Sequence, residues 1–154
     1  MFKVLIVEDD IHKLDSLCKF IKNHLSNCKV FTAMSLRDAI ESIDNDFFDL
    51  VLIDMAIPSH AILPGTGSPI SLLTGGLDII LELSSLDRED DCIIITQHPE
   101  IEICSRVFSV NNAKENIKAL LECDVLECIE YIEGDTSWEE KLRETISIYE
   151  NFNS

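Results

Sequence analysis

The chain has 154 residues, a length typical of one domain with a substantial core. It carries 12 Lys and Arg against 29 Asp and Glu, which gives a formal net charge of −17. This charge argues against binding to nucleic acid or to an anionic membrane, because both are polyanions, and favours cations and basic partner surfaces. No apolar run approaches the roughly 20 residues that span a bilayer, and the first residues lack a secretory signal pattern.

The cysteine pattern indicates thiols rather than disulfides or a metal site. No CxxC pair and no metal-type spacing with histidine occurs. We therefore expect reduced core residues in a cytoplasmic protein. The six cysteines are Cys18, Cys28, Cys92, Cys104, Cys123 and Cys128.

The first third of the chain alternates between strand and helix patterns. Residues 3–7 are an apolar strand that runs into Glu8, Asp9 and Asp10. Residues 11–26 have apolar side chains at helical spacing, which predicts an amphipathic helix on a sheet. The apolar stripe is Leu14, Leu17, Cys18, Ile21 and Leu25, with Lys13, Lys19 and Lys22 between its members. Residues 29–33 form a short second strand.

The second helix and third strand follow at once. Ser35 is placed as an N-cap with Asp38 three residues later, in the style of a capping box, and the helix ends at Asn45 and Asp46. Its buried stripe is Leu36, Ala39, Ile40 and Ile43. Residues 49–54 then form a buried parallel strand that ends in Asp54, before a proline that cannot continue a central ladder.

The remaining chain repeats this alternation with one interruption. Residues 59–76 are rich in Gly, Pro, Ser and Thr without useful periodicity, which predicts a long loop beside Asp54. A helix over 77–86 and a buried strand over 92–96, ending in the hydroxyl of Thr96, come next. Residues 97–111 are ambiguous, because Pro99 favours a helix start whereas Val107 and Phe108 look extended.

The last segments complete the pattern. Residues 112–122 predict a helix and residues 125–132 an edge strand. Thr136 or Ser137 begins a final helix that reaches about residue 150. Its core face is Trp138, Leu142, Ile146 and Tyr149.

Five strand–helix units predict an α/β fold, a doubly wound parallel sheet with helices on both faces. The common arrangement at this size is flavodoxin-like, with five strands in the order 2-1-3-4-5. Because ligands bind where the strand order reverses, at the carboxyl ends of the strands, Glu8, Asp9 and Asp54 should converge in one crevice. Thr96 should lie on the other side of Asp54.

Three clustered carboxylates repel one another unless a cation neutralises them. Mg²⁺ meets this need with oxygen ligands, and takes one or two carboxylates together with phosphate oxygens and water. A carboxylate beside such a metal can attack phosphorus and form an acyl phosphate. The predicted chemistry is therefore Mg²⁺-assisted phosphoryl transfer.

The same residues resemble the receiver domain of two-component response regulators. The matching stretches, in order, are Val-Leu-Ile-Val-Glu8-Asp9-Asp10, Asp49-Leu-Val-Leu-Ile-Asp54-Met-x-x-Pro58, Gly76-Leu-Asp-Ile-Ile-Leu-Glu-Leu and Ile-Ile-Ile-Thr96. The resemblance covers nearly the whole chain, so residues 1–154 are interpreted as one receiver-like domain with a loop insertion at 59–76.

The resemblance implies a role for each site residue. Asp54 would be the phospho-acceptor, and Mg²⁺ would be held by Asp9, Asp54 and the backbone carbonyl of Ala56, with Glu8 acting through water. Thr96 would be the switch hydroxyl that follows the phosphoryl group. A histidine kinase or phosphotransfer protein would donate, and a downstream protein would dock. A homodimer through the helix 4–strand 5–helix 5 face is a further expectation. At most, the domain would phosphorylate itself in a Mg²⁺-dependent reaction, without multiple turnover.

Two features depart from the family pattern. Receivers place a lysine at the end of strand 5, which pairs with the phosphoryl group, but this region reads Cys128-Ile-Glu-Tyr131 and offers none. Tyr131 is our candidate for that position. The other departure is the loop at 59–76, which is longer than usual.

These departures leave other functions open. One is a pseudo-receiver, a protein-interaction module that is not phosphorylated. Another is a Mg²⁺ phosphotransfer or nucleic-acid enzyme of the Toprim or haloacid-dehalogenase type, although Asp54-Met-Ala56 lacks the second acid of their Asp-x-Asp pattern. Plainer interpretations are that Asp54 caps a strand end, that Glu8, Asp9 and Asp10 are a solvated helix start, and that Thr96 is an ordinary strand residue.

Overall fold

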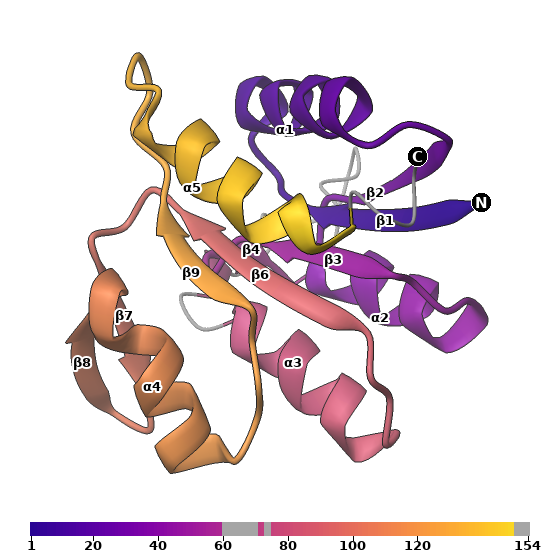
Figure 1. The fold of residues 1–154 in the computed structure, drawn as a ribbon. Helices are drawn as coiled ribbons and strands as arrows, with labels where there is room; N and C mark the ends of the chain where they lie inside the picture. Colours follow the sequence, from indigo (N-terminus) through magenta and orange to yellow (C-terminus); the bar gives the residue numbers. More distant parts are fainter. Residues whose placement is uncertain (60–70, 73–74, 150–154) are drawn as a thin grey trace, which may run out of the picture.

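Five parallel strands form one sheet with helices on both faces (Figure 1). The structure is a computed structural model and describes residues 1–59, 71–72 and 75–149. The strand order is β2-β1-β3-β6-β9, which confirms the predicted 2-1-3-4-5 topology. The strands are β1 (Phe2–Val7), β2 (Cys28–Ala33), β3 (Leu50–Ile53), β6 (Asp91–Thr96) and β9 (Glu127–Glu130).

Two helices cover one face of the sheet and three cover the other (Figure 1). The first pair is α1 (Ile11–His24) and α5 (Ser137–Ile146), with a 3-10 turn, Ser147–Tyr149, after α5. The other three are α2 (Leu36–Asn45), α3 (Gly75–Ser85) and α4 (Val110–Leu121). Alternate residues of β1 show why both faces close: Val4 and Ile6 pack under α1 and α5, whereas Leu5 and Val7 pack on the opposite side.

The strand register brings the chemistry-bearing residues together. Val7 pairs with Ile53, and Ile53 pairs with Ile94, so β1, β3 and β6 end at nearly the same level. The hydrogen bonding between β1 and β3 continues one residue past the end of β3, because Asp54 N donates to Val7 O at 3.0 Å. Residues 8 and 54 therefore emerge side by side at the carboxyl edge.

The helix starts follow their sequence signals in two of three cases. Ser35 caps α2 as predicted, since its Oγ accepts a hydrogen bond from Asp38 N at 3.1 Å. Asp10 caps α1, because its side chain accepts from His12 N and Lys13 N. Of the three acids Glu8, Asp9 and Asp10, only Asp10 therefore acts as the start of a helix. Thr136 occupies the N-cap of α5 without a side-chain bond.

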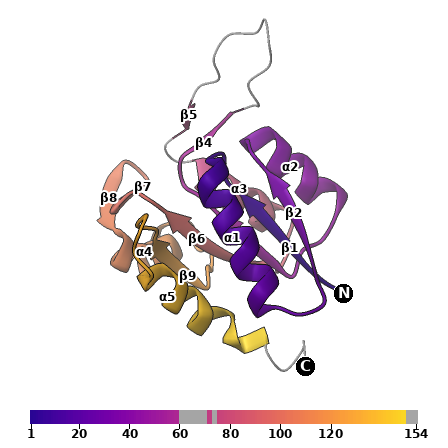
Figure 2. The ribbon, with the colours of Figure 1, turned by 90° about the horizontal axis from the view of Figure 1, so that it is seen from above.

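Two short hairpins lie outside the main sheet. Strands β4 (Ile57–Pro58) and β5 (Ser71–Leu72) pair antiparallel. β4 lies just before the predicted long loop at 59–76, and β5 lies within it. Figure 2 shows them beyond the carboxyl end of β1. Residues 60–70 and 73–74 of the predicted insertion lie outside the described residues.

The ambiguous segment before α4 is the second hairpin. Strands β7 (Glu100–Ile103) and β8 (Arg106–Ser109) pair antiparallel, so the possible helix start at Pro99 is wrong. Cys104 and Ser105 form the turn with positive φ angles of 51° and 64°. The buried side of β7, Ile101 and Ile103, anchors the hairpin in the core beside α4.

The cysteines divide by burial. Cys92, Cys123 and Cys128 are buried, and Cys18 and Cys28 are half-buried. Cys104 is exposed in the β7–β8 turn, so its assignment to the core is wrong. Within the described residues, no helix is both long and apolar enough to cross a membrane.

Candidate functional site

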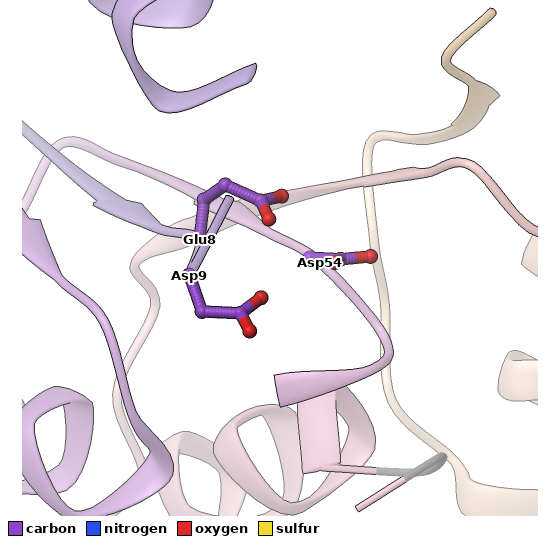
Figure 3. A group of neighbouring side chains, drawn as sticks. All are labelled: Glu8, Asp9 and Asp54. Carbon is purple, nitrogen blue, oxygen red and sulfur yellow. The ribbon is translucent and has the colours of Figure 1, made fainter. Parts of the chain in front are cut away.

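Three carboxylates converge at the carboxyl edge of the sheet (Figure 3). Glu8 and Asp9 follow β1, and Asp54 follows β3. One carboxylate oxygen from each lies within 4.8 Å of the other two. Glu8 and Asp54 are buried, with 0% and 3% of their surfaces exposed, whereas Asp9 is exposed. The structure thus brings together the three acids that the sequence predicted to meet.

The backbone around these acids is held from two sides. Glu8 N donates to Ala33 O at 3.0 Å, and the Glu8 carboxylate accepts from Asp10 N at 3.0 Å, which connects the site to the start of α1. On the other side, α3 approaches so closely that a Cβ on Gly76 would lie 2.6 Å from Asp54 O. Only glycine permits this contact, because real Cβ atoms do not approach a backbone oxygen so closely.

A buried lysine completes the site, and sequence reasoning missed it. The sequence pattern groups Lys13 with Lys19 and Lys22 between the apolar residues of an amphipathic helix and gives it no role at the site, yet it is only 1% exposed. Its Nζ lies 2.6 Å from Glu8 Oε2 and 3.5 Å from Asp54 Oδ1. The same ammonium donates to Ile95 O at 2.7 Å and to Gln97 Oε1 at 2.9 Å.

The end of β9 offers no lysine, as the sequence indicates, but α1 supplies one to the same site. Its place in the sequence could have indicated this role, because Lys13 lies in the first helical turn after the acidic run, where the helix begins over the strand ends. Tyr131, the candidate for the strand-5 position, lies beside it, with Lys13 Nζ 5.6 Å from the ring centroid.

Burial dominates the electrostatics of the two acids that follow β1. It raises the pKa of Glu8 to about 7, because an ionised carboxylate loses its hydration; Lys13 opposes this rise and Asp54 adds to it. Partial desolvation also raises the pKa of Asp9, with a smaller contribution in the same direction from Asp54. The Lys13 ammonium thus offsets only part of the cost of ionising Glu8 among these acids.

The acids offer what a hard divalent cation needs. Glu8 Oε2 and Asp54 Oδ1 are buried and, apart from the Lys13 ammonium, receive no hydrogen bond from the described residues. Oxygen atoms that are buried, anionic and short of donors suit Mg²⁺ or Ca²⁺ ligation. The donor set fits a magnesium ion, and Asp9 is the exposed acid of the three.

Thr96 lies at the end of β6, the strand next to Asp54. It is fully buried, and its Oγ1 accepts a hydrogen bond from His98 N at 3.2 Å. Tyr131 N donates to Thr96 O at 2.8 Å, which joins the ends of β6 and β9. Ala56 follows Asp54 by two residues and is half-buried.

The comparisons with known proteins agree with this geometry. The family described as "Response regulator receiver domain" matches residues 4–120. One curated relative is the Detocs response regulatory protein DtcB of Vibrio alginolyticus, 36% identical over 102 residues that cover 65% of this chain and 68% of that protein.

Solved structures share the fold at low identity. The signal receiver domain of a Luxo repressor protein from Vibrio parahaemolyticus has a TM-score of 0.65 and 19% identity, over 96% of this chain and 88% of that one. A CheY-like receiver domain protein from Methanospirillum hungatei has a TM-score of 0.62 and 18% identity, over 99% and 96%. The response regulator TrrA from Thermotoga maritima, in complex with Mg²⁺ and BeF, has a TM-score of 0.58 and 18% identity, over 94% and 99%.

The match to the family extends from β1 into α4 and includes all three acids of the site. Given that match and the sheet order, the chain belongs to the response regulator receiver domain family.

Proposed function

We propose that this receiver domain takes a phosphoryl group onto Asp54 from a histidine kinase or a phosphotransfer protein. The observation that carries the proposal is the meeting of Glu8, Asp9 and Asp54 within 4.8 Å, with a buried ammonium beside the acceptor. Asp54 is the acid of this group that follows the central strand and lies between the other two acids and β6.

The transfer requires Asp54 to act as a nucleophile. A carboxylate oxygen of Asp54 forms a bond to phosphorus as the P–N bond of a donor phosphohistidine breaks. The electron pair of that bond stays on the imidazole nitrogen. The product is an acyl phosphate on Asp54 and a histidine on the donor. With acetyl phosphate as donor, a P–O bond breaks and acetate leaves.

A magnesium ion is the cofactor that the acids would hold. Asp9 and Asp54 are the proposed direct ligands, with the carbonyl of Ala56 a third, and Glu8 acts through water. When bound, Mg²⁺ supplies a counter-charge that shields the incoming phosphoryl group from the carboxylates. The chain itself keeps Glu8 and Asp54 buried and holds them in position at the ends of two hydrogen-bonded strands.

Thr96 is proposed to transmit the modification. Its hydroxyl lies at the end of the strand beside Asp54, and a turn of the side chain to donate its O–H to a phosphoryl oxygen would displace the oxygen that accepts from His98 N. His98 leads into the β7–β8 hairpin, so a change there would alter a surface next to α4. A downstream protein that reads this surface would complete the signal in the cytoplasm.

The test is the intact mass of the protein after incubation with acetyl phosphate and Mg²⁺. We expect one phosphoryl group on the wild type, none after Asp54→Asn, and one after Asp44→Asn, which removes an exposed acid from α2 as a matched control. Labelling that needs no Mg²⁺, or that persists in Asp54→Asn, would refute the assignment.

One observation favours a second function, a pseudo-receiver that binds partners without phosphorylation. The end of β9, Cys128 to Tyr131, holds no lysine. The same experiment separates the two functions. A folded wild type that gains no mass with acetyl phosphate, or with any cognate kinase, would support the pseudo-receiver.

A further inference from the structure

The buried ammonium of Lys13 is the least expected feature of the site. It enters from α1, which packs on the face of the sheet opposite to the one that the β7–β8 hairpin joins, and the residue is only 1% exposed. Burying an ammonium costs several kcal/mol unless anionic partners compensate. A purely structural role at this position would be served by an apolar residue, because Leu17 and Ile21 continue the buried stripe of the same helix.

The surroundings of Lys13 show what it neutralises. Within the part of the chain that the structure describes, no other lysine, arginine or histidine nitrogen lies within 4.0 Å of the Glu8 or Asp54 carboxylates. Three carboxylates therefore share one ammonium. Any further anionic group at Asp54 adds to an existing excess of negative charge, so it depends on that ammonium and on a bound cation together.

The hydrogen bonds of Lys13 include one that can be exchanged for a bond to a new acceptor. An ammonium has three N–H donors, and three oxygens lie within 2.9 Å of it: Glu8 Oε2, Ile95 O and Gln97 Oε1. The contact to Asp54 Oδ1, at 3.5 Å, is too long for a strong hydrogen bond. Gln97 is exposed, so water can replace its bond to Lys13 at little cost.

We infer that Lys13 of α1 is the cationic residue that binds the phosphoryl group on Asp54. On phosphorylation, its ammonium exchanges the bond to Gln97 for one to a phosphoryl oxygen and keeps its contacts to Glu8 and Ile95. This inference rests on the proposed phosphorylation of Asp54. The cation that contacts the phosphoryl group would thus come from the first turn of α1, because the end of β9 has no lysine to provide it.

The test measures equilibrium binding of Mg²⁺ alone, and of beryllofluoride with Mg²⁺, alongside phosphorylation by acetyl phosphate. Beryllofluoride serves as a non-reactive phosphoryl analogue. In Lys13→Met we expect beryllofluoride affinity to fall by about ten- to 100-fold, the scale of one charge-assisted hydrogen bond. We expect Mg²⁺ alone to bind as tightly or more tightly, because a competing cation has gone.

Three further variants make the result specific. Lys19→Met removes an exposed lysine of the same helix, paired with Asp15 at 3.0 Å, and should behave as the wild type. Lys13→Gln keeps hydrogen-bond donors without the charge and should lose beryllofluoride binding even if Lys13→Met fails to fold. Lys13→Met combined with Tyr131→Lys returns an ammonium from β9, beside the vacated position, and should recover binding.

The outcomes separate this inference from the proposed function. A wild type that binds neither beryllofluoride nor a phosphoryl group refutes the proposed function and the inference with it. A wild type that binds both, with Lys13→Gln within twofold of it, refutes the inference alone. Joint loss of Mg²⁺ and beryllofluoride binding in the Lys13 variants, without recovery by Tyr131→Lys, would show a structural role only.

Discussion

Glu8 makes the stability of this domain depend on pH in a direction opposite to that of most acids. Burial raises its pKa from 4.5 to about 7, so the folded state favours the protonated carboxyl. The stabilising contribution is fully present below 4.5, the pKa in the unfolded chain, and is lost as the pH rises through about 7. The difference between these pKa values corresponds to about 3 kcal/mol of unfolding free energy.

The perturbation that isolates this effect is Glu8→Gln, which keeps the side-chain shape and cannot ionise. In urea denaturation without Mg²⁺, the unfolding free energy of the wild type relative to Glu8→Gln should fall by about 3 kcal/mol between pH 4.5 and pH 8. Saturating Mg²⁺ should recover much of that loss above pH 7, because the cation favours the ionised carboxylate.

The control is Glu41→Gln, which neutralises an exposed acid on α2 and should show no such pH dependence relative to the wild type. A stability difference between wild type and Glu8→Gln that stays constant from pH 4.5 to 8, or that grows with pH, would refute the reasoning. It would mean that the pairing with Lys13 outweighs the desolvation of Glu8.

Three other predictions test how the site and its scaffold are held. Gly76→Ala places a methyl group 2.6 Å from Asp54 O, so it should cost about 1–3 kcal/mol in urea denaturation and slow labelling by acetyl phosphate; unchanged stability and labelling would contradict the close approach. Ser35→Ala removes the cap of α2 and should cost about 1 kcal/mol, measured in the same way, whereas a change within error would show that the cap bond is not made. Burial raises the pKa of Cys92 to about 12, so in the native protein a disulfide reagent at pH 8 should modify exposed Cys104 first and Cys92 only after unfolding; equal rates would show that the β6 core opens readily.

Local patterns in the sequence were sufficient for the sheet and for its acidic edge. The apolar runs before Glu8 and Asp54 are short and end in carboxylates, and strand–helix alternation leaves few topologies. Parallel strands end at a common edge, so the meeting of Glu8, Asp9 and Asp54 follows once the strand order is known. The Ser35 cap follows from side-chain chemistry within a single turn.

The two hairpins could not be predicted from such patterns. The pairing of β4 with β5 joins residues just before the long insertion to residues within it, and two-residue strands carry no periodicity. The β7–β8 turn uses Cys104 and Ser105 with positive φ, where sequence rules expect Gly or Asn. In both cases the hairpin depends on contacts outside the segment itself, such as Ile101 and Ile103 against the α4 core.

Lys13 shows most clearly what only the tertiary structure decided. Helical periodicity assigns residues to faces of α1, and a lysine between apolar neighbours is assigned to solvent by its chemical type. Its burial depends on where the first turn of α1 lies relative to the strand ends, and on the acids that two other segments bring there. An ammonium is stable in that position because buried carboxylates compensate its desolvation, and their convergence exists only once the sheet has formed.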